Sequence, residues 1–208
     1  RNKMKIVAVI PARGGSKGIK NKNLKTLKKK PLIYWSIKSA KESKLIEDFF
    51  VSTEDKKIKS VALKHKCKVI DRPKNLSRDS SKTIEVIQHA IKITKADVII
   101  CIQPTSPKRP KGIVDSCLKK YLKNNADTLA TGRIIHNFEW GKYNNLSRQK
   151  LKGWFWDDGS IYILKAKDIL KNKWVGKKLY KYHLEKKYNL LEIDDLEDFE
   201  IIDQTFNF

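Results

Sequence analysis

The chain has 208 residues, which corresponds most simply to one domain with its own hydrophobic core. Hydrophobic residues make up 40% of it and Gly and Pro are scarce, which excludes a disordered, collagen-like or low-complexity protein. The formal net charge of +23 first suggests nucleic acid, an acidic membrane surface or an anionic substrate as partner. However, 39 of the 46 basic residues are Lys, which matches phosphates and base edges less well than Arg. We therefore expect no nucleic-acid partner.

The cysteines and the apolar runs indicate the compartment. Three isolated cysteines form neither a CxxC pair nor a Cys/His cluster, so neither a disulfide framework nor a zinc site is favoured. The longest apolar runs are strand-sized, far short of the ~20 residues that a membrane helix needs. We expect a protein of the reducing cytoplasm, without a membrane partner.

Short apolar runs alternate with amphipathic segments, an order typical of βαβ units. The stripe of Ile84, Ile87 and Ile91 is the clearest helical signal. The alternation predicts a single α/β domain with a largely parallel sheet. In chain order, the predicted elements are strand 5–10, helix 32–43, strand 49–55, helix 58–65, strand 68–73, helix 83–94, strand 98–104, helix 113–122, strand 127–132, strand 159–164, helix 166–170, edge strand 180–185 and a last helix capped by Asp195.

Residues 133–157 interrupt this alternation. The segment is polar and aromatic, contains Gly and Asn, and carries three of the five Trp residues. We predict one domain over residues 1–208 with an excursion at 133–157. The excursion would serve as a substrate lid or as a subunit contact, and the second role would make the protein a homodimer.

The first predicted strand is followed by Pro-Ala-Arg-Gly-Gly-Ser-Lys-Gly, residues 11–18. Glycines let backbone N–H groups approach an anion closely, while Arg13, Lys17 and Lys22 add three cations and Ser16 a hydroxyl. The loop has neither the GK[ST] of a Walker A loop nor GxGxxG spacing. Ligands of parallel sheets bind at the carboxyl ends of strands, so the pattern favours a polyphosphate site. The alternative is an ordinary turn in a Lys-rich protein.

The C-terminal segment concentrates acids in an otherwise basic chain. Glu192 and Asp194 alternate with Ile193, so on a strand both carboxylates would point to one side. Two hard oxygen ligands suit Mg²⁺ that also bridges to phosphate. The alternative is a solvated strand face.

The segment IPARGGSKGIKNKNL resembles the N-terminal signature of the acylneuraminate cytidylyltransferases, the CMP-sialic acid synthetases. The resemblance implies a single-domain, Rossmann-like nucleotidyltransferase fold, with a mostly parallel sheet and helices on both faces. It also implies an enzyme that activates an acidic nine-carbon sugar with CTP and Mg²⁺ and releases pyrophosphate. It continues in order through nearly the whole chain, in the segments VSTEDKKI, RPKNLSRDSSKT, QPTSPKR, DDGSIYI and EIDDLEDF.

The resemblance also implies a role for each matching position. Arg13, Lys17 and Lys22 would be the catalytic cations on the triphosphate. The remaining residues would bind nucleotide (Ser16, Asn23, Arg72, Ser81, Thr83), sugar (Gln103, Arg148) or metal (Glu192, Asp194), and Asp158 would lie near the sugar where the family has Asn. Each has an ordinary alternative: Ser81 and Thr83 would cap the next helix, and Arg148 would be a solvated side chain. The family usually has Asp at the position of Glu192.

One segment departs from the family. Trp156-Asp157-Asp158 precedes Gly159 where the sialic acid enzymes resemble Arg-Pro-Asn-Gly. A negative charge there would repel a carboxylate but bind an amino or hydroxyl group. Two alternatives therefore stay open: a transferase of the same fold acting on GTP with legionaminate or CTP with pseudaminate, and a basic nucleic-acid-binding protein with an inactive site.

Overall fold

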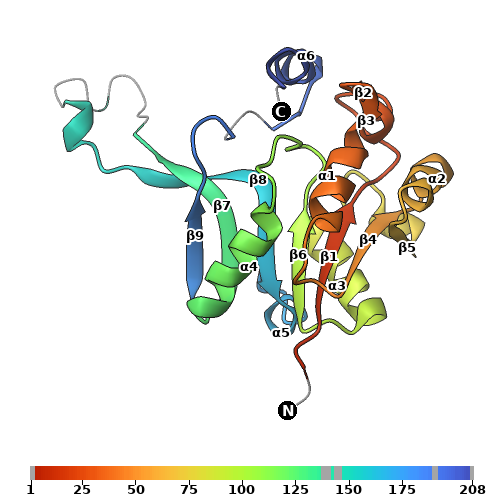
Figure 1. Ribbon diagram of the computed structural model, residues 1–208, viewed down its shortest axis with the longest axis horizontal. Helices are drawn as coiled ribbons and strands as arrows, with labels where there is room; N and C mark the ends of the chain where they lie inside the picture. Colours follow the sequence, from red (N-terminus) through yellow and green to blue (C-terminus); the bar gives the residue numbers. More distant parts are fainter. Residues whose placement is uncertain (1–2, 137–141, 143–146, 189–191, 207–208) are drawn as a thin grey trace.

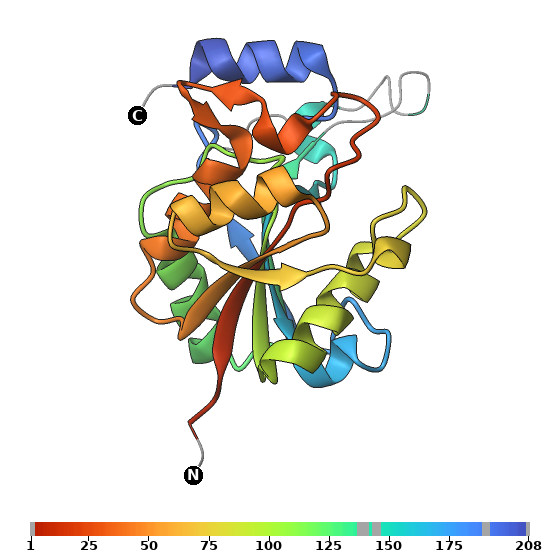
Figure 2. The same cartoon turned by 90° about the vertical axis from the view of Figure 1, so that its right-hand side faces the viewer.

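The computed structural model describes residues 3–136, 142, 147–188 and 192–206 and contains a seven-stranded sheet between helices (Figures 1 and 2). The strands of this sheet are β1 (Ile6–Pro11), β4 (Asp48–Thr53), β5 (Lys68–Asp71), β6 (Val98–Ile102), β7 (Thr128–Ile135), β8 (Trp154–Lys165) and β9 (Leu179–His183). Their order across the sheet is β5-β4-β1-β6-β8-β7-β9. Only β8 runs antiparallel to its neighbours, so the predicted α/β fold with a mostly parallel sheet is confirmed.

Helices cover both faces of the sheet. They are α1 (Leu32–Lys41), α2 (Lys56–Lys64), α3 (Thr83–Thr94), α4 (Ile113–Lys123), α5 (Ala166–Ile169) and α6 (Leu196–Thr205), with short 3-10 turns η1 (Lys22–Leu24), η2 (Lys74–Leu76) and η3 (Arg148–Lys150). The alternation along β1 shows the two faces: Ala8 and Ile10 pack with α1, α2 and α4, whereas Val7 and Val9 pack with α3 and α5. A strand buried on both sides is apolar throughout, as β1 and β6 are.

A small hairpin and the last helix close the carboxyl edge of the sheet. The hairpin pairs β2 (Thr26–Leu27) with β3 (Lys30–Pro31) through Lys28 and Lys29, both at positive φ, which is the backbone of a type I′ turn. Asp203 of α6 accepts a hydrogen bond from the Lys28 backbone N–H at 3.1 Å. An apolar cluster that includes Leu27, Trp35 and Phe199 joins hairpin, α1 and α6. The sequence pattern did not predict this hairpin.

Two predicted segments differ in the structure. The expectation that Glu192 and Asp194 alternate along a strand is wrong, because this segment has no strand partner and instead crosses the edge of the sheet toward Thr105. The strands around 133–157 are longer than predicted: β7 continues to Ile135 and β8 begins at Trp154, and they pair antiparallel. In Figure 1 their far ends extend away from the body of the sheet. Trp140 lies outside the described residues.

The last helix begins as predicted. Asp195 is the N-cap of α6 and its carboxylate accepts a hydrogen bond from the Asp198 backbone N–H at 2.9 Å.

No described helix is long and apolar enough to cross a membrane.

Candidate active site

Four parallel strands bring the candidate segments to one edge. β5, β4, β1 and β6 are neighbours, and their carboxyl ends lead into Arg72, Glu54, the loop 12–21 and Gln103, respectively. From β1 the chain adds β4 and β5 on one side of the sheet, and it then returns to add β6 on the other side of β1. The boundary between β1 and β6 is therefore a topological switch point. Such a point is where open α/β sheets bind ligands.

The glycine loop after β1 is held by polar contacts from two sides. The Gly14 backbone N–H donates to Glu54 Oε1 at 2.8 Å. The buried Asn23 side chain donates from Nδ2 to the Arg13 carbonyl at 2.9 Å. Asn23 therefore orders the loop, and the half-buried Ser16 lies within it.

Two predicted cations of this loop converge on one carboxylate. Lys17 Nζ lies 2.8 Å from Asp79 Oδ2, and Arg13 donates to Asp79 Oδ1. Hydrogen bonds from Lys17 and Arg13 hold the pKa of the Asp79 carboxyl below its usual range. The two side chains are thus able to grip a single anion together, as a phosphate would require.

Lys22 connects the loop to the C-terminal segment. Its Nζ donates to the Ile193 carbonyl at 2.7 Å. Burial lowers the pKa of Lys22, and the Asp194 and Glu192 carboxylates act against that shift. Gly18 permits the close approach, because a Cβ there would lie 2.3 Å from the Asp194 carbonyl oxygen. The structure therefore brings Lys22, Glu192 and Asp194 together, although they are not on a strand.

Glu192 is half-buried beside the loop after β6. Its Oε1 accepts from the Thr105 hydroxyl at 2.8 Å, and the Ile193 backbone N–H donates to the Thr105 carbonyl at 2.8 Å. Burial raises the pKa of Glu192, and Asp194 and Asp157 raise it further. Gly159, at φ +63°, leaves room for it, since a Cβ would lie 2.9 Å from Glu192 Oε2.

The donor set at this place suits a hard cation. No three metal-ligating side chains gather among the described residues. Glu192 and the exposed Asp194 nevertheless supply two carboxylates, and the negative charge of Asp194 raises the pKa of Glu192. Mg²⁺ commonly binds one or two carboxylates plus substrate phosphates, so these two residues fit it.

Arg72 is buried at the end of β5. Its guanidinium donates to the Ser52 carbonyl at 2.7 Å and to Ser52 Oγ at 3.2 Å. Burial lowers its pKa to about 10, opposed by Glu54. Glu54 Oε2 is itself buried without a hydrogen-bond partner among the described residues.

Ser81 and Thr83 do not cap the helix that follows them. The N-cap of α3 is Lys82, whose backbone N–H donates to Glu85 at 2.8 Å. Ser81 Oγ instead donates to the Asn75 carbonyl at 3.0 Å and accepts from the Arg78 N–H at 3.2 Å. Thr83 is exposed in the first turn of α3. Their prediction as nucleotide ligands stays a prediction.

The candidate sugar residues lie where β6 and β8 meet. Gln103 follows β6, and its backbone N–H donates to the Ser160 carbonyl at 3.2 Å. Asp158 is buried, and its Oδ1 accepts from the Thr131 hydroxyl at 2.6 Å and from the Ser160 N–H at 3.0 Å. Burial raises the pKa of Asp158. The backbone of Arg148 is in η3, but its side chain lies outside the described part of the structure.

Arg109 is a functional candidate that the sequence analysis missed. It is buried behind the loop 103–109, where its guanidinium donates to Ser160 Oγ at 2.9 Å, to Ser36 Oγ at 3.1 Å and to the Gln103 carbonyl. Burial lowers its pKa to about 10. It was detectable as one of only seven Arg residues in a Lys-rich chain, within the motif QPTSPKR. Glu54 and Thr105 gave no comparable signal.

A cationic glycine loop that faces a carboxylate pair at the carboxyl edge of a mostly parallel sheet is typical of α/β nucleotidyltransferases. A family model described as Cytidylyltransferase matches residues 7–204, and the chain therefore belongs to the cytidylyltransferase family.

Curated relatives and a solved structure agree with this family. The chain is 30% identical to an N-acylneuraminate cytidylyltransferase of Escherichia coli O18:K1:H7 over 95% of its length and 51% of the relative's. It is 29% identical to a pseudaminic acid cytidylyltransferase of Campylobacter jejuni over 95% of its length and 94% of the relative's. A structure of a CMP:2-keto-3-deoxy-manno-octonic acid synthetase complexed with CTP has the same fold, with a TM-score of 0.76, 15% identity and coverage of 97% and 98% of the two chains. The chain thus spans about half the length of the first relative and nearly all of the second.

Proposed function

We propose that this chain transfers a cytidylyl group from CTP to a nonulosonic α-keto acid sugar, giving the CMP-sugar and pyrophosphate. The observation that carries this proposal is the contact of Lys22 with Ile193 at 2.7 Å, which places the cationic loop against Glu192 and Asp194. Phosphoryl transfer depends on positioning and on charge stabilisation, which cationic side chains and a carboxylate-bound metal ion supply.

The reaction needs positioning more than covalent help from the protein. The anomeric hydroxyl of the sugar attacks the α-phosphorus of CTP and gives up its proton to water. A new P–O bond forms, and the bond between the α-phosphorus and the oxygen that bridges to the β-phosphorus breaks, which releases pyrophosphate. Arg13, Lys17 and Lys22 stabilise the charge that develops on the leaving pyrophosphate. Both Arg13 and Lys17 contact Asp79 in the structure. To bind the phosphates, they exchange this carboxylate for phosphate oxygens.

The nucleoside lies along the carboxyl ends of β1 and β5 and the start of α3. Two hydrogen bonds to Ser52 fix the Arg72 guanidinium, so its orientation exists before the nucleotide binds. Asn23, Ser81 and Thr83 complete the nucleotide residues, with Asn23 acting through the loop backbone that it orders. Pre-oriented groups lower the entropy cost of binding.

Glu192 and Asp194 would hold Mg²⁺. When bound, this ion neutralises phosphate charge and thereby makes the pyrophosphate a better leaving group. The chain contributes the orientation: Thr105 fixes Glu192 by a 2.8 Å hydrogen bond, and Lys22 fixes the segment between the two carboxylates.

The sugar lies on the other side of β6, with Gln103, Arg148 and Asp158 as its proposed residues. Arg109 holds the carbonyl of Gln103, so it sets the direction of the backbone there. Asp157 is exposed beside Asp158 and accepts from the Tyr162 hydroxyl at 2.8 Å. A carboxylate at this place favours a sugar that presents an amino or hydroxyl hydrogen.

Pseudaminic acid is the second candidate sugar, and one observation favours it. The Campylobacter jejuni relative named for that sugar is matched over 94% of its length, while the N-acylneuraminate relative is matched over half. The chemistry at the phosphates would be unchanged.

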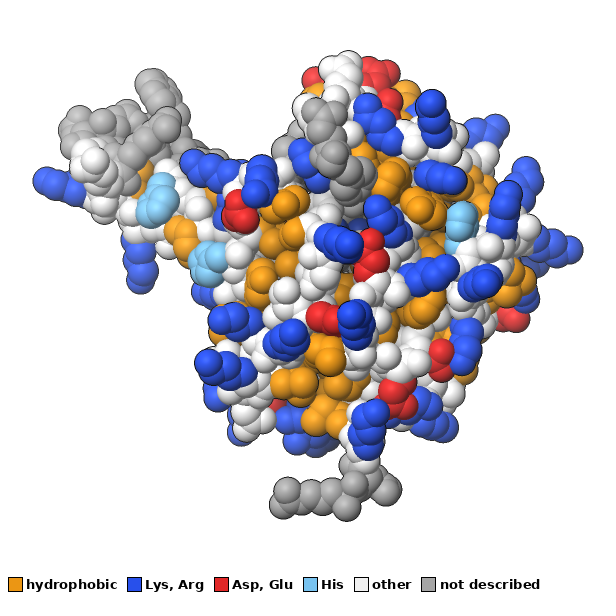
Figure 3. All heavy atoms as spheres, in the orientation of Figure 1, with side chains coloured by type: hydrophobic (Ala, Val, Ile, Leu, Met, Phe, Trp, Pro, Cys, Tyr) orange, Lys and Arg blue, Asp and Glu red, His pale blue; other side chains and the backbone are white. Residues whose placement is uncertain are grey.

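The distribution of basic side chains bears on the proposed partners. On the face in Figure 3, Lys and Arg side chains are spread over the whole surface, whereas a nucleic-acid-binding protein gathers them in a stripe. We propose CTP and the sugar as partners without nucleic acid or membrane, and a cytoplasmic location. The β7–β8 extension, with Trp154 and Trp156 exposed, is the proposed lid or subunit contact of a homodimer.

The test is pyrophosphate release over a matrix of four nucleoside triphosphates and several nonulosonic acids, including N-acetylneuraminate, pseudaminate and legionaminate. We expect release with CTP and one acid only. Release with GTP and legionaminate would replace the substrate pair. No release in any well, together with tight duplex binding and a steep salt dependence, would favour the nucleic-acid alternative.

A further inference from the structure

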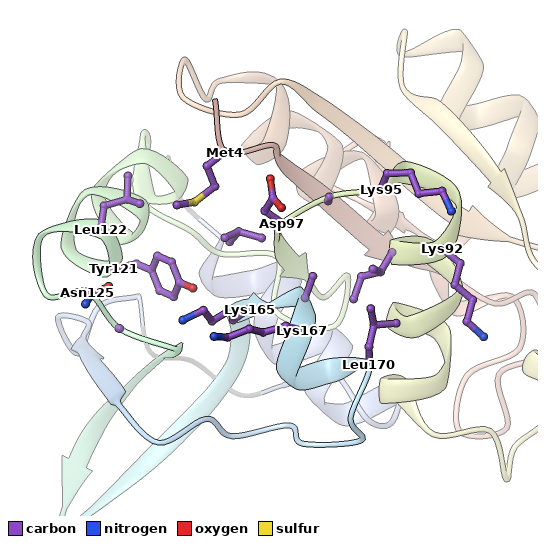
Figure 4. Close-up of a pocket in the computed structure, with 15 residues that line it drawn as sticks. Met4, Lys92, Lys95, Asp97, Tyr121, Leu122, Asn125, Lys165, Lys167 and Leu170 are labelled. Carbon is purple, nitrogen blue, oxygen red and sulfur yellow. The ribbon is translucent and has the colours of Figure 1, made fainter. Parts of the chain in front are cut away.

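A cavity of about 660 Å³ lies at the edge of the sheet opposite the candidate active site (Figure 4). It is bounded by the start of β6, the end of β8, the last turns of α3 and α4, and α5. None of the proposed nucleotide, sugar or metal residues lines it. Cavities of roughly 300–1,000 Å³ with largely apolar walls are typical small-molecule sites.

The mouth of this cavity exposes apolar side chains. Met4, Leu122 and Leu170 are 47%, 44% and 49% exposed, respectively, and all three line the cavity. Ile91 and Val98 continue the apolar wall in the interior. Exposed apolar side chains that gather around one hollow favour a ligand over solvent.

Tyr121 supplies the polar group of the cavity. The residue is only 4% exposed, yet its hydroxyl has no hydrogen-bond partner anywhere in the described chain. Figure 4 shows the hydroxyl end directed toward the ammonium ends of Lys165 and Lys167. Burial, together with the nearby Asp127 and Asp168 carboxylates, raises the pKa of Tyr121 to about 12, so the hydroxyl keeps its proton and is able to donate. The hydroxyl oxygen is not among the fully buried unpartnered atoms of the described residues, so it opens into the cavity, where a ligand is able to accept its hydrogen bond.

The charges around the cavity favour an anion. Four lysines line it with one acid, Asp97, whose Oδ2 already accepts from the Lys5 backbone N–H at 2.8 Å, and two further carboxylates near Tyr121, Asp127 and Asp168, lie outside the lining. Lys165 is paired with Asp127 at 2.8 Å. Lys167 is exposed and forms no ion pair with a described carboxylate, which leaves it available beside Tyr121.

We propose that this cavity binds a small amphipathic carboxylate. Its apolar chain packs against Met4, Leu122 and Leu170, and its carboxylate accepts the Tyr121 hydrogen bond next to Lys167. This is a binding site separate from the nucleotide and sugar sites.

The experiment is a calorimetric titration of the full chain with octanoate, with octylammonium and acetate as matched ligands. We expect octanoate to bind one to one, and we expect no binding of octylammonium, which has the same chain with the opposite charge, or of acetate, which lacks the chain. Equal binding of octanoate and octylammonium, or binding of neither, overturns the proposal.

Three variants localise the site. Tyr121→Phe should weaken octanoate binding about tenfold, the usual effect of one hydrogen bond to a charged group. Leu122→Glu should abolish binding, whereas Leu63→Glu, on the exposed face of α2, should leave it unchanged. Equal binding to wild type and Tyr121→Phe, or equal effects of the two glutamates, overturns the proposal. The proposal is also overturned if the wild-type chain forms a dimer that covers the cavity and the Leu122→Glu variant is a monomer.

Discussion

Lys22 donates a hydrogen bond from Nζ to the carbonyl of Ile193 at 2.7 Å, across 171 positions of sequence. This contact joins the glycine loop after the first strand to the acidic segment before the last helix. It places a half-buried ammonium beside the segment that carries Glu192 and Asp194, whose carboxylates both act on its pKa. Lys22 therefore fixes the position of the acidic segment relative to the glycine loop.

Replacement of Lys22 tests the cationic loop. Lys22→Met should lower CTP-dependent pyrophosphate release about a hundredfold, because one preorganised donor to developing charge is typically worth that much. Initial rates at saturating CTP give the measurement, and Lys20→Met, an exposed lysine of the same loop, is the control. Equal rates in both variants would show that Lys22 has no part in the transfer.

Removal of one carboxylate tests the metal assignment. Asp194→Asn should lower Mg²⁺-dependent turnover by about a hundredfold or more, while the circular dichroism spectrum stays that of wild type. Glu197→Gln changes an exposed acid of α6 nearby and should leave turnover unaffected. Full activity of Asp194→Asn at all Mg²⁺ concentrations would refute the assignment.

Arg109 should act as a positioning residue for the sugar side of the site. Arg109→Met leaves the Gln103 carbonyl and the Ser160 hydroxyl without their buried donor, at a cost of about 2–4 kcal/mol of stability. Thermal unfolding should shift down by roughly 5–10 °C.

The kinetic constants separate this role from a purely structural one. The KM of the Arg109 variant for the sugar should rise more than that for CTP, and Arg109→Lys should restore part of the difference. Lys111→Met, on the exposed surface nearby, is the control. An equal rise in both KM values would contradict a positioning role.

The buried Asp158 predicts a pH-dependent stability. Its pKa is raised in the folded state above the ordinary value of 3.8, so the folded protein binds more protons than the unfolded one between these two values. Wild-type stability should fall as pH rises through that window and level off above it. Because Asn does not titrate, the Tm of Asp158→Asn relative to wild type should increase from pH 4 to pH 7. A constant difference, or the same increase in Asp157→Asn, would contradict the burial effect.

Hydrophobic periodicity predicted much of the fold because burial decides it. The α3 helix has the bounds that its isoleucine stripe indicates, and β1 and β6 are the apolar runs expected of strands buried on both faces. Periodicity carries no information on strand direction, so the antiparallel course of β8 was not visible. The Lys28-Lys29 turn lacks the Asn-Gly or Asp-Gly signal of a type I′ hairpin, and tertiary contact with α6 stabilises it instead.

The candidate site was predictable where motifs lie at strand ends. The glycine loop, Arg72 and Gln103 meet at one edge because the carboxyl ends of parallel strands do so. The alternation of Glu192 and Asp194 was misleading, because side-chain contacts with Thr105 and Lys22, rather than strand pairing, fix that segment. Long-range contacts of this kind leave no periodic trace in a sequence.

The central claim is tested most directly by phosphorus NMR of a reaction that contains the chain, CTP, Mg²⁺ and pseudaminate or N-acetylneuraminate. The account predicts that a phosphodiester resonance of a CMP-sugar and pyrophosphate appear in equal amounts. It also predicts that Arg13→Ala forms both at least tenfold more slowly, since Arg13 is one of two cations that converge at the phosphate position. Pyrophosphate without the phosphodiester, or an Arg13→Ala rate equal to that of wild type, would contradict it.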